Sequence, residues 1–192
     1  MTDFWLFFEL GLSHVLDWRA YDHILFLVAL CAAYNFGSWK RLLLLVTLFT
    51  VGHTLSLLLA NYELVQVSSA WIEFLIPVTI LAAAIYNVAT AGKEKRLDTI
   101  SIVYFITFFF GLIHGFGFAT YFKMLAADGE LFPLLEFAFG VEISQVVIAL
   151  VVLTAEYVTQ TFVRCSKRDW ILVVSSIVIG MSIPMLMETW PF

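Results

Sequence analysis

Long apolar stretches separated by short polar breaks are the feature that most limits how this chain can fold. Six of them are candidates for membrane-crossing helices, at approximately residues 21–36, 42–60, 71–90, 99–121, 132–162 and 170–188. Because a crossing needs about 20 apolar residues, the first is short and the fifth is long. The chain is 62% hydrophobic and 13% charged, whereas soluble domains are only about 45–50% apolar. We therefore expect an all-α, polytopic transmembrane helix bundle with six crossings, forming a single integral membrane domain over residues 1–192.

A shorter apolar stretch, residues 4–16, precedes the six candidates. Such a length is typical of an interfacial or re-entrant segment, although packing inside the bundle could complete it as a seventh helix. A cleaved secretory signal starts with basic residues, whereas this segment carries the acids Asp3 and Glu9. We therefore expect it to remain in the mature protein.

The charges of the connections predict a topology, because Lys and Arg are retained on the cytoplasmic side of a membrane. Three alternate connections are basic, with Lys40 and Arg41, then Lys93, Lys95 and Arg96, then Arg164, Lys167 and Arg168. The remaining connections, residues 61–70 and 122–131, contain Lys123 as their only base. Six crossings with both termini outside satisfy this pattern. The expected partner is the lipid bilayer, not nucleic acid.

All four histidines lie in or beside apolar segments: His14, His23, His53 and His114. A single histidine in such a place is more often a packing group that bonds to a neighbouring helix. Polar groups at membrane depth are costly, however, and usually mark a site or a pathway. Four out of four therefore indicate a function.

Carboxylates and amides accompany the histidines. Asp22 directly precedes His23, and Glu142 lies one helical turn before Gln145. Glu73 and Asn87 lie fourteen residues apart, on nearly the same side of one predicted helix. An unpaired buried carboxylate takes up a proton or needs a cation, so we expect these groups to converge inside the bundle.

Imidazole and carboxylate together are the ligand set of a borderline divalent metal such as nickel, zinc or cobalt. Our leading hypothesis is therefore a bound metal ion. A proton relay could use the same residues, and their spacing does not separate the two. The candidate ligands are His14, Asp22, His23, His53, His114 and Glu142, and the candidates that orient these ligands are Glu73, Asn87 and Gln145.

The surroundings of His114 are rich in glycine, at Gly111, Gly115 and Gly117. Glycine lets a helix break or lets another backbone approach closely. Freed carbonyl groups could then face an ion beside the imidazole; the alternative is a close helix crossing with His114 as an interhelical donor. The segment FTVGHT, around His53, loosely resembles FGLIHG.

Five motifs in this order resemble the HupE/UreJ family of bacterial membrane proteins, which are regarded as nickel or cobalt permeases. The motifs are GLSH followed by YDHILFLVAL, then FTVGHTLSLLLA, WIEFLIPVTILAAAIYN, FGLIHGFGFA and FAFGVEISQ. The similarity runs from about Gly11 to Gln145. Ala138 and Ser144 stand where the family pattern has asparagine and glycine. The resemblance implies a multi-pass protein of the bacterial inner membrane that carries a divalent metal ion.

Three functions remain open at this point. A permease would carry nickel, cobalt or possibly zinc through a His/carboxylate site in the bundle, without direct ATP use because no phosphate-binding loop is present. An intramembrane zinc-dependent hydrolase would use the same cluster, with Asp22 or Glu142 as general base. An accessory subunit would use the polar residues for packing only. Of these we favour the transporter over an enzyme. The oligomeric state stays open, a homo-oligomer included.

Overall fold

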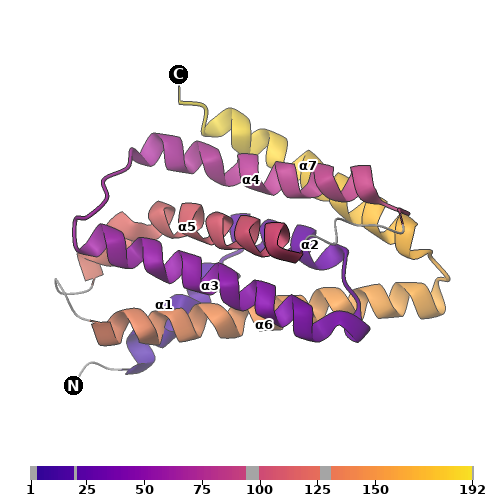
Figure 1. The fold of residues 1–192 in the computed structure, drawn as a ribbon, viewed down its shortest axis with the longest axis horizontal. Coiled ribbons are helices and arrows are strands. Elements are labelled where there is room, and N and C mark those ends of the chain that lie inside the picture. Colours follow the sequence, from indigo (N-terminus) through magenta and orange to yellow (C-terminus); the bar gives the residue numbers. More distant parts are fainter. Residues whose placement is uncertain (1–3, 20, 94–99, 126–130, 192) are drawn as a thin grey trace.

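The computed structural model describes residues 4–19, 21–93, 100–125 and 131–191. Within these ranges the chain forms seven α-helices, one short 3-10 helix and no strand (Figure 1). The elements are α1 Phe4–Leu16, α2 Asp22–Ala32, η1 Phe36–Ser38, α3 Trp39–Asn61, α4 Ser69–Thr90, α5 Ile100–Leu125, α6 Leu131–Phe162 and α7 Lys167–Glu188. In the described part of the chain, five helices, α3 to α7, are long and apolar enough to cross a membrane. The predicted polytopic helical bundle is confirmed.

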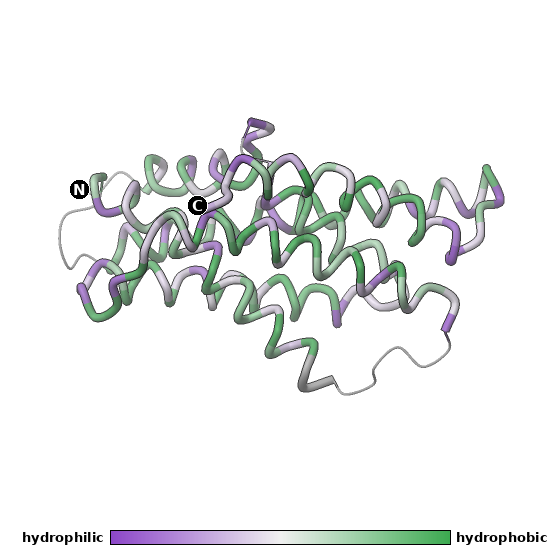
Figure 2. Tube along the Cα trace, turned by 90° about the horizontal axis from the view of Figure 1, so that it is seen from above, coloured by the Kyte–Doolittle hydropathy of each residue, from purple (hydrophilic) through white to green (hydrophobic). Residues whose placement is uncertain are grey.

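Hydrophobic residues run along most of the length of the helices, and hydrophilic residues gather mainly near their ends (Figure 2). Large apolar side chains such as Phe105, Leu135 and Val151 are exposed on the outside of the bundle. An aqueous surface of this composition would be unfavourable, whereas lipid tails solvate it without cost. The chain is therefore a membrane protein.

The predicted crossing at residues 21–36 is not one long helix. Its helical part, α2, contains only 11 residues, and a turn follows in which Ser38 Oγ donates to Asn35 Oδ1 at 3.1 Å. The predicted short segment 4–16 is helical throughout, as α1 with 13 residues. Both helices pack against α6 and follow each other in the same direction (Figure 1). Their 13 and 11 residues, 24 in total, reach about 36 Å at 1.5 Å per residue, enough to replace one crossing.

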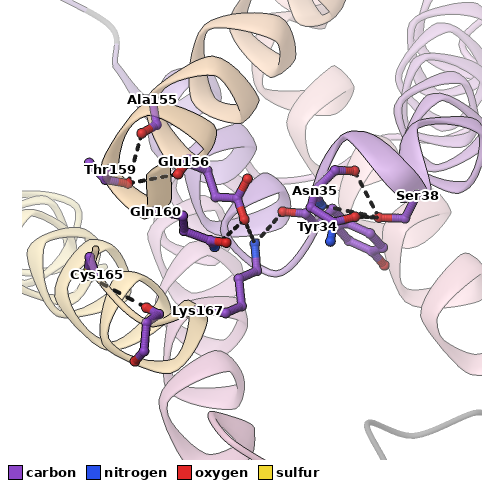
Figure 3. Close-up of polar contacts among 10 residues, drawn as sticks. Tyr34, Asn35, Ser38, Ala155, Glu156, Thr159, Gln160, Cys165 and Lys167 are labelled. Carbon is purple, nitrogen blue, oxygen red and sulfur yellow. Dashed lines mark hydrogen bonds and ion pairs between the residues drawn. The ribbon is translucent and has the colours of Figure 1, made fainter. Parts of the chain in front are cut away.

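Basic connections meet at one end of the bundle, as the charge pattern predicts. A Cβ atom on Gly92, after α4, would lie 2.9 Å from Arg168 Cδ at the start of α7. Lys167 Nζ, next to Arg168, donates to the carbonyl oxygen of Tyr34 after α2 and to Glu156 Oε1 at 2.9 Å (Figure 3). Lys95 and Arg96 lie outside the described residues.

Glu156 is the buried member of this pair, with 3% of its surface exposed. Gln160 Nε2, one turn later on α6, donates to the same carboxylate (Figure 3). A buried carboxylate needs such donors and a counter-charge. The Lys167–Glu156 pair therefore joins α6 and α7 to the end of α2.

The opposite end carries little uncompensated positive charge. Lys123 Nζ donates to Glu63 Oε1 at 2.6 Å, and this contact lowers the pKa of the exposed Glu63 carboxyl. The contrast between the two ends agrees with the predicted topology, and the placement of the termini outside remains a prediction.

Two pairs of helices cross at glycines in the same way. α1 meets α6 at Gly11 and Gly140, and α3 meets α5 at Gly52 and Gly111. A Cβ atom on any of these four glycines would lie 2.2 Å from a backbone carbonyl oxygen of the opposite helix. Larger residues would force the helices apart, because small residues are what permits such close crossings.

The two crossings occupy matching places when the helices are grouped into two sets of three units that run in opposite directions. α1 and α6 begin at one end of the bundle, whereas α3 and α5 begin at the other (Figure 1). When the unit α1–α2 is matched to α5, α3 to α6 and α4 to α7, the contact of α1 with α6 corresponds to that of α5 with α3. The contact of α2 with α7 likewise corresponds to that of α5 with α4. Gly-Leu-x-His occurs at residues 11–14 and 111–114, at the same place in both halves.

Candidate metal centre

The four histidines come from four helices that meet in the interior. His14 lies near the end of α1, His23 at the start of α2, His53 in α3 and His114 in α5. His14 and His114 each follow a crossing glycine by three residues, and His53 follows Gly52 directly. The close glycine crossings therefore bring their rings together.

Three of the rings form a compact group. One ring nitrogen from each of His14, His23 and His53 lies within 4.8 Å of the others. Their ring centroids are 4.6 Å apart for His14 and His23, 5.6 Å for His14 and His53, and 5.8 Å for His23 and His53. His114 adjoins this group, with its ring centroid 5.1 Å from that of His23.

The Nε2 atoms of all four rings are buried, and none has a hydrogen-bond partner among the residues that the structure describes. Buried polar atoms are nearly always bonded, so unpartnered nitrogens on four adjoining rings require an explanation. A shared cation supplies one, because each imidazole nitrogen can donate a lone pair to a metal ion.

Two contacts set which nitrogen can bind a metal. Nδ1 of His23 lies 3.1 Å from Asp22 Oδ1, and Nδ1 of His114 lies 2.8 Å from the carbonyl oxygen of Phe110. Both oxygens are acceptors, so Nδ1 carries the proton and donates, and Nε2 keeps its lone pair. Metal-bound histidines are commonly oriented in this way by a carboxylate or a backbone carbonyl.

The structure places the predicted carboxylates and amides in different surroundings. Asp22 contacts His23 and lies outside the group of three ligand atoms. Glu142 accepts hydrogen bonds from Thr47 and Thr50 of α3, and Gln145 shares Thr50 with it. These two residues therefore belong to a separate cluster between α3 and α6.

Two further predicted residues lie in α4. Asn87 is buried, and its Nδ2 donates to the carbonyl oxygen of Ala29 at 2.7 Å. It therefore joins α4 to α2. Glu73 is exposed near the start of α4.

Aromatic rings close the histidine group on two sides. The ring of Phe118 lies 3.9 Å from that of His14 and stacks on Phe137 at 5.1 Å. Phe26 lies on another side, with its ring 5.5 Å from that of His114 and 5.5 Å from that of Phe110. Sequence alone does not distinguish these rings, because a phenylalanine beside a site looks the same in sequence as one facing lipid.

A cavity of about 400 Å³ begins behind Phe26 and Phe110. It lies between α2, α4 and α5, and its wall includes Tyr34 and Arg41 from the end with the basic connections. The cavity therefore leads from the aromatic rings beside His114 toward that end of the bundle.

The fold and the site define a polytopic helical membrane protein with a buried group of histidines. A profile of the HupE / UreJ protein family matches residues 1–190. The chain belongs to the HupE/UreJ protein family, as its five motifs predicted. Comparisons with curated proteins and with solved structures gave no match.

Proposed function

We propose that the protein is a permease for a divalent transition-metal ion, nickel or cobalt, which it binds with His14, His23, His53 and His114. The observation that carries this proposal is the grouping of three histidine rings, adjoined by His114, whose buried Nε2 atoms all lack partners within the described ranges. Imidazole suits nickel, cobalt and zinc, and the family's association with nickel and cobalt favours the first two.

In this proposal Asp22 orients His23 instead of binding the metal directly. Its carboxylate holds Nδ1 of His23, and such contacts also raise the basicity of the ligand. Its negative charge offsets part of the charge of the cation.

The architecture supports movement of the ion. Many transporters consist of inverted repeats with a site at their interface, formed in part by interrupted helices. Here His14 and His23 lie on either side of the break between α1 and α2. His14 and His114 occupy matching places in the two halves. A motion that exchanges the conformations of the halves would expose the site to each side in turn.

The cavity supplies a route to the basic end in this scheme. Phe26 and Phe110 line its inner part. The ring of Phe26 contacts the ring of His114 on one side and the ring of Phe110 on another. Rotation of these two rings would connect the histidines with the cavity. On the opposite side, Phe118 and Phe137 would have to move for the ion to enter.

The test is metal analysis of the purified protein together with metal uptake into proteoliposomes. Wild type is expected to bind one nickel or cobalt ion per chain and to transport it. His23→Ala, His53→Ala and His114→Ala are expected to lose both properties. Ser175→Ala is the control, because Ser175 is a fully buried polar residue of α7, a helix that contributes no histidine.

Each alternative outcome has a definite meaning. Histidine variants that lose folding yield without any stoichiometric metal in wild type would point to an accessory subunit and refute the proposal. Tight metal binding without uptake would also contradict it. The two candidate bases do not support the hydrolase. Asp22 is bonded to His23, and Glu142 is bonded to Thr47 and Thr50.

A further inference from the structure

A second polar cluster lies between α3 and α6. It consists of two threonine hydroxyls, one carboxylate and one side-chain amide. Oγ1 of Thr47 donates to Glu142 Oε1 at 2.7 Å, and Oγ1 of Thr50 contacts Glu142 Oε2. The same Thr50 oxygen lies 3.2 Å from Gln145 Oε1 and 3.3 Å from the carbonyl oxygen of Val46. No histidine takes part in these contacts.

Thr50 has more acceptors within reach than protons to donate. Thr50 has one hydroxyl proton and three acceptors within reach. If the Gln145 amide were turned over, its Nε2 would donate to Thr50. Its oxygen would then lie where Nε2 now lies, buried and without a partner in the described structure. Gln145 is fully buried, so water does not readily resolve this mismatch.

The charge of Glu142 is also unbalanced. Among the described residues, no Lys, Arg or His nitrogen lies within 4 Å of its carboxylate, since the three pairs found there involve Asp22, Glu63 and Glu156. A carboxylate within a membrane-crossing helix is costly as a bare anion. A bound cation would balance this charge.

We propose that Glu142, Thr47, Thr50 and Gln145 form a binding site for a hard monovalent metal cation, sodium, distinct from the histidine site. Oxygen ligands favour hard cations, whereas imidazole favours borderline metals. The single carboxylate makes the occupied site neutral with one monovalent ion. A divalent ion would leave a net charge of +1 inside the membrane, which is unfavourable.

The position of this site couples it to the histidines. Thr50 lies three residues before His53, on the same face of α3. α3 is also the helix that crosses α5 at Gly52 and Gly111. Occupancy of the cation site fixes α3 against α6, and thereby shifts the position of His53. The coupling rests on the proposed function, whereas the binding of the cation does not.

Thermal unfolding of the purified full-length protein, without nickel, tests the binding. Sodium replaces choline at constant ionic strength and pH. The midpoint is expected to rise by about 5–10 °C when the sodium concentration is 100 times the dissociation constant.

Three variants make the assignment specific. Glu142→Gln and Thr50→Val are expected to abolish the cation response and to keep one nickel ion per chain. Glu73→Gln, which removes an exposed carboxylate of α4, is the control and should respond like wild type. If Glu142→Gln does not fold, Thr47→Val with Thr50→Val retains the carboxylate and tests the same cluster.

Two results would overturn the proposal. One is a wild-type protein whose midpoint does not respond to sodium. The other is a folded Glu142→Gln variant that loses its nickel, because Glu142 would then be a ligand of the histidine site. If nickel uptake fails in every protein but the cation response remains, the permease is wrong and the cation site stands.

Discussion

Substitution of Gly111 by alanine tests whether the glycine crossings position the histidines. The new Cβ would lie 2.2 Å from the carbonyl oxygen of Phe49. Because such contacts require about 3.3 Å, α3 and α5 must separate there by about 1 Å. His53 and His114 lie close to this crossing on the two helices, so their separation changes by a similar amount. Metal–nitrogen distances tolerate only about 0.2 Å, and we expect a loss of nickel affinity of about 10–100-fold.

The same substitution should lower stability. Overpacking costs about 1–3 kcal/mol, which corresponds to a decrease of roughly 3–10 °C in the unfolding midpoint of a chain of this size. Gly180→Ala in α7 is the matched control, since no atom lies within 4 Å of a Cβ at that position. It should keep the affinity and gain slightly in stability from helix propensity.

Nickel affinity is measured by competition with a chromophoric chelator, and stability by tryptophan fluorescence during heating. A Gly111→Ala protein with wild-type affinity and midpoint would refute the reasoning, because the helices would then have room for a methyl group. Equal losses in Gly180→Ala would show that the effect is not specific to the crossing.

Three further predictions concern other parts of the structure. Asp22→Asn should weaken nickel binding by about 10–100-fold and leave its stoichiometry unchanged; unchanged affinity would contradict the orienting role. Ala83→Trp in the cavity should block nickel uptake into proteoliposomes while equilibrium binding persists, and undiminished uptake would exclude this route. Lys167→Met should reduce unfolding free energy by about 1–3 kcal/mol because it strands the buried Glu156 charge, and adding Glu156→Gln should restore most of the loss in a denaturant titration.

Much of the fold could be predicted from sequence, because membrane-crossing helices must satisfy their backbone bonds internally and be apolar for about 20 residues. The two short helices were harder. Asp17 and Arg19 mark the break after α1, but the end of α2 at Ala32 depends on the turn capped by Asn35 and Ser38. Asn35, Gly37 and Ser38 are turn residues and agree with the predicted end of the segment at Phe36, whereas the end of the helix four residues earlier has no clear signal in the sequence.

The histidines could be predicted as a group because each is costly at membrane depth. Their partners could not, since the register between two helices depends on contacts that a single sequence does not contain. Glu142 shows this limit: a carboxylate within a membrane helix made it a candidate metal ligand, but only the structure shows its hydrogen bonds with Thr47 and Thr50. The glycines around His114 were a useful signal: α5 runs through them as one helix, and Gly111 lies at the close crossing with α3, the second of the two alternatives.

X-ray absorption spectroscopy of the nickel-loaded protein tests the central claim most directly, because it reports the ligands around the metal. The proposal predicts three or four imidazole nitrogens at about 2.0–2.1 Å, with fewer imidazoles in a folded His53→Ala or His114→Ala protein that is forced to bind at high nickel concentration. A coordination shell of oxygen atoms without imidazole, unchanged in these variants, would contradict it.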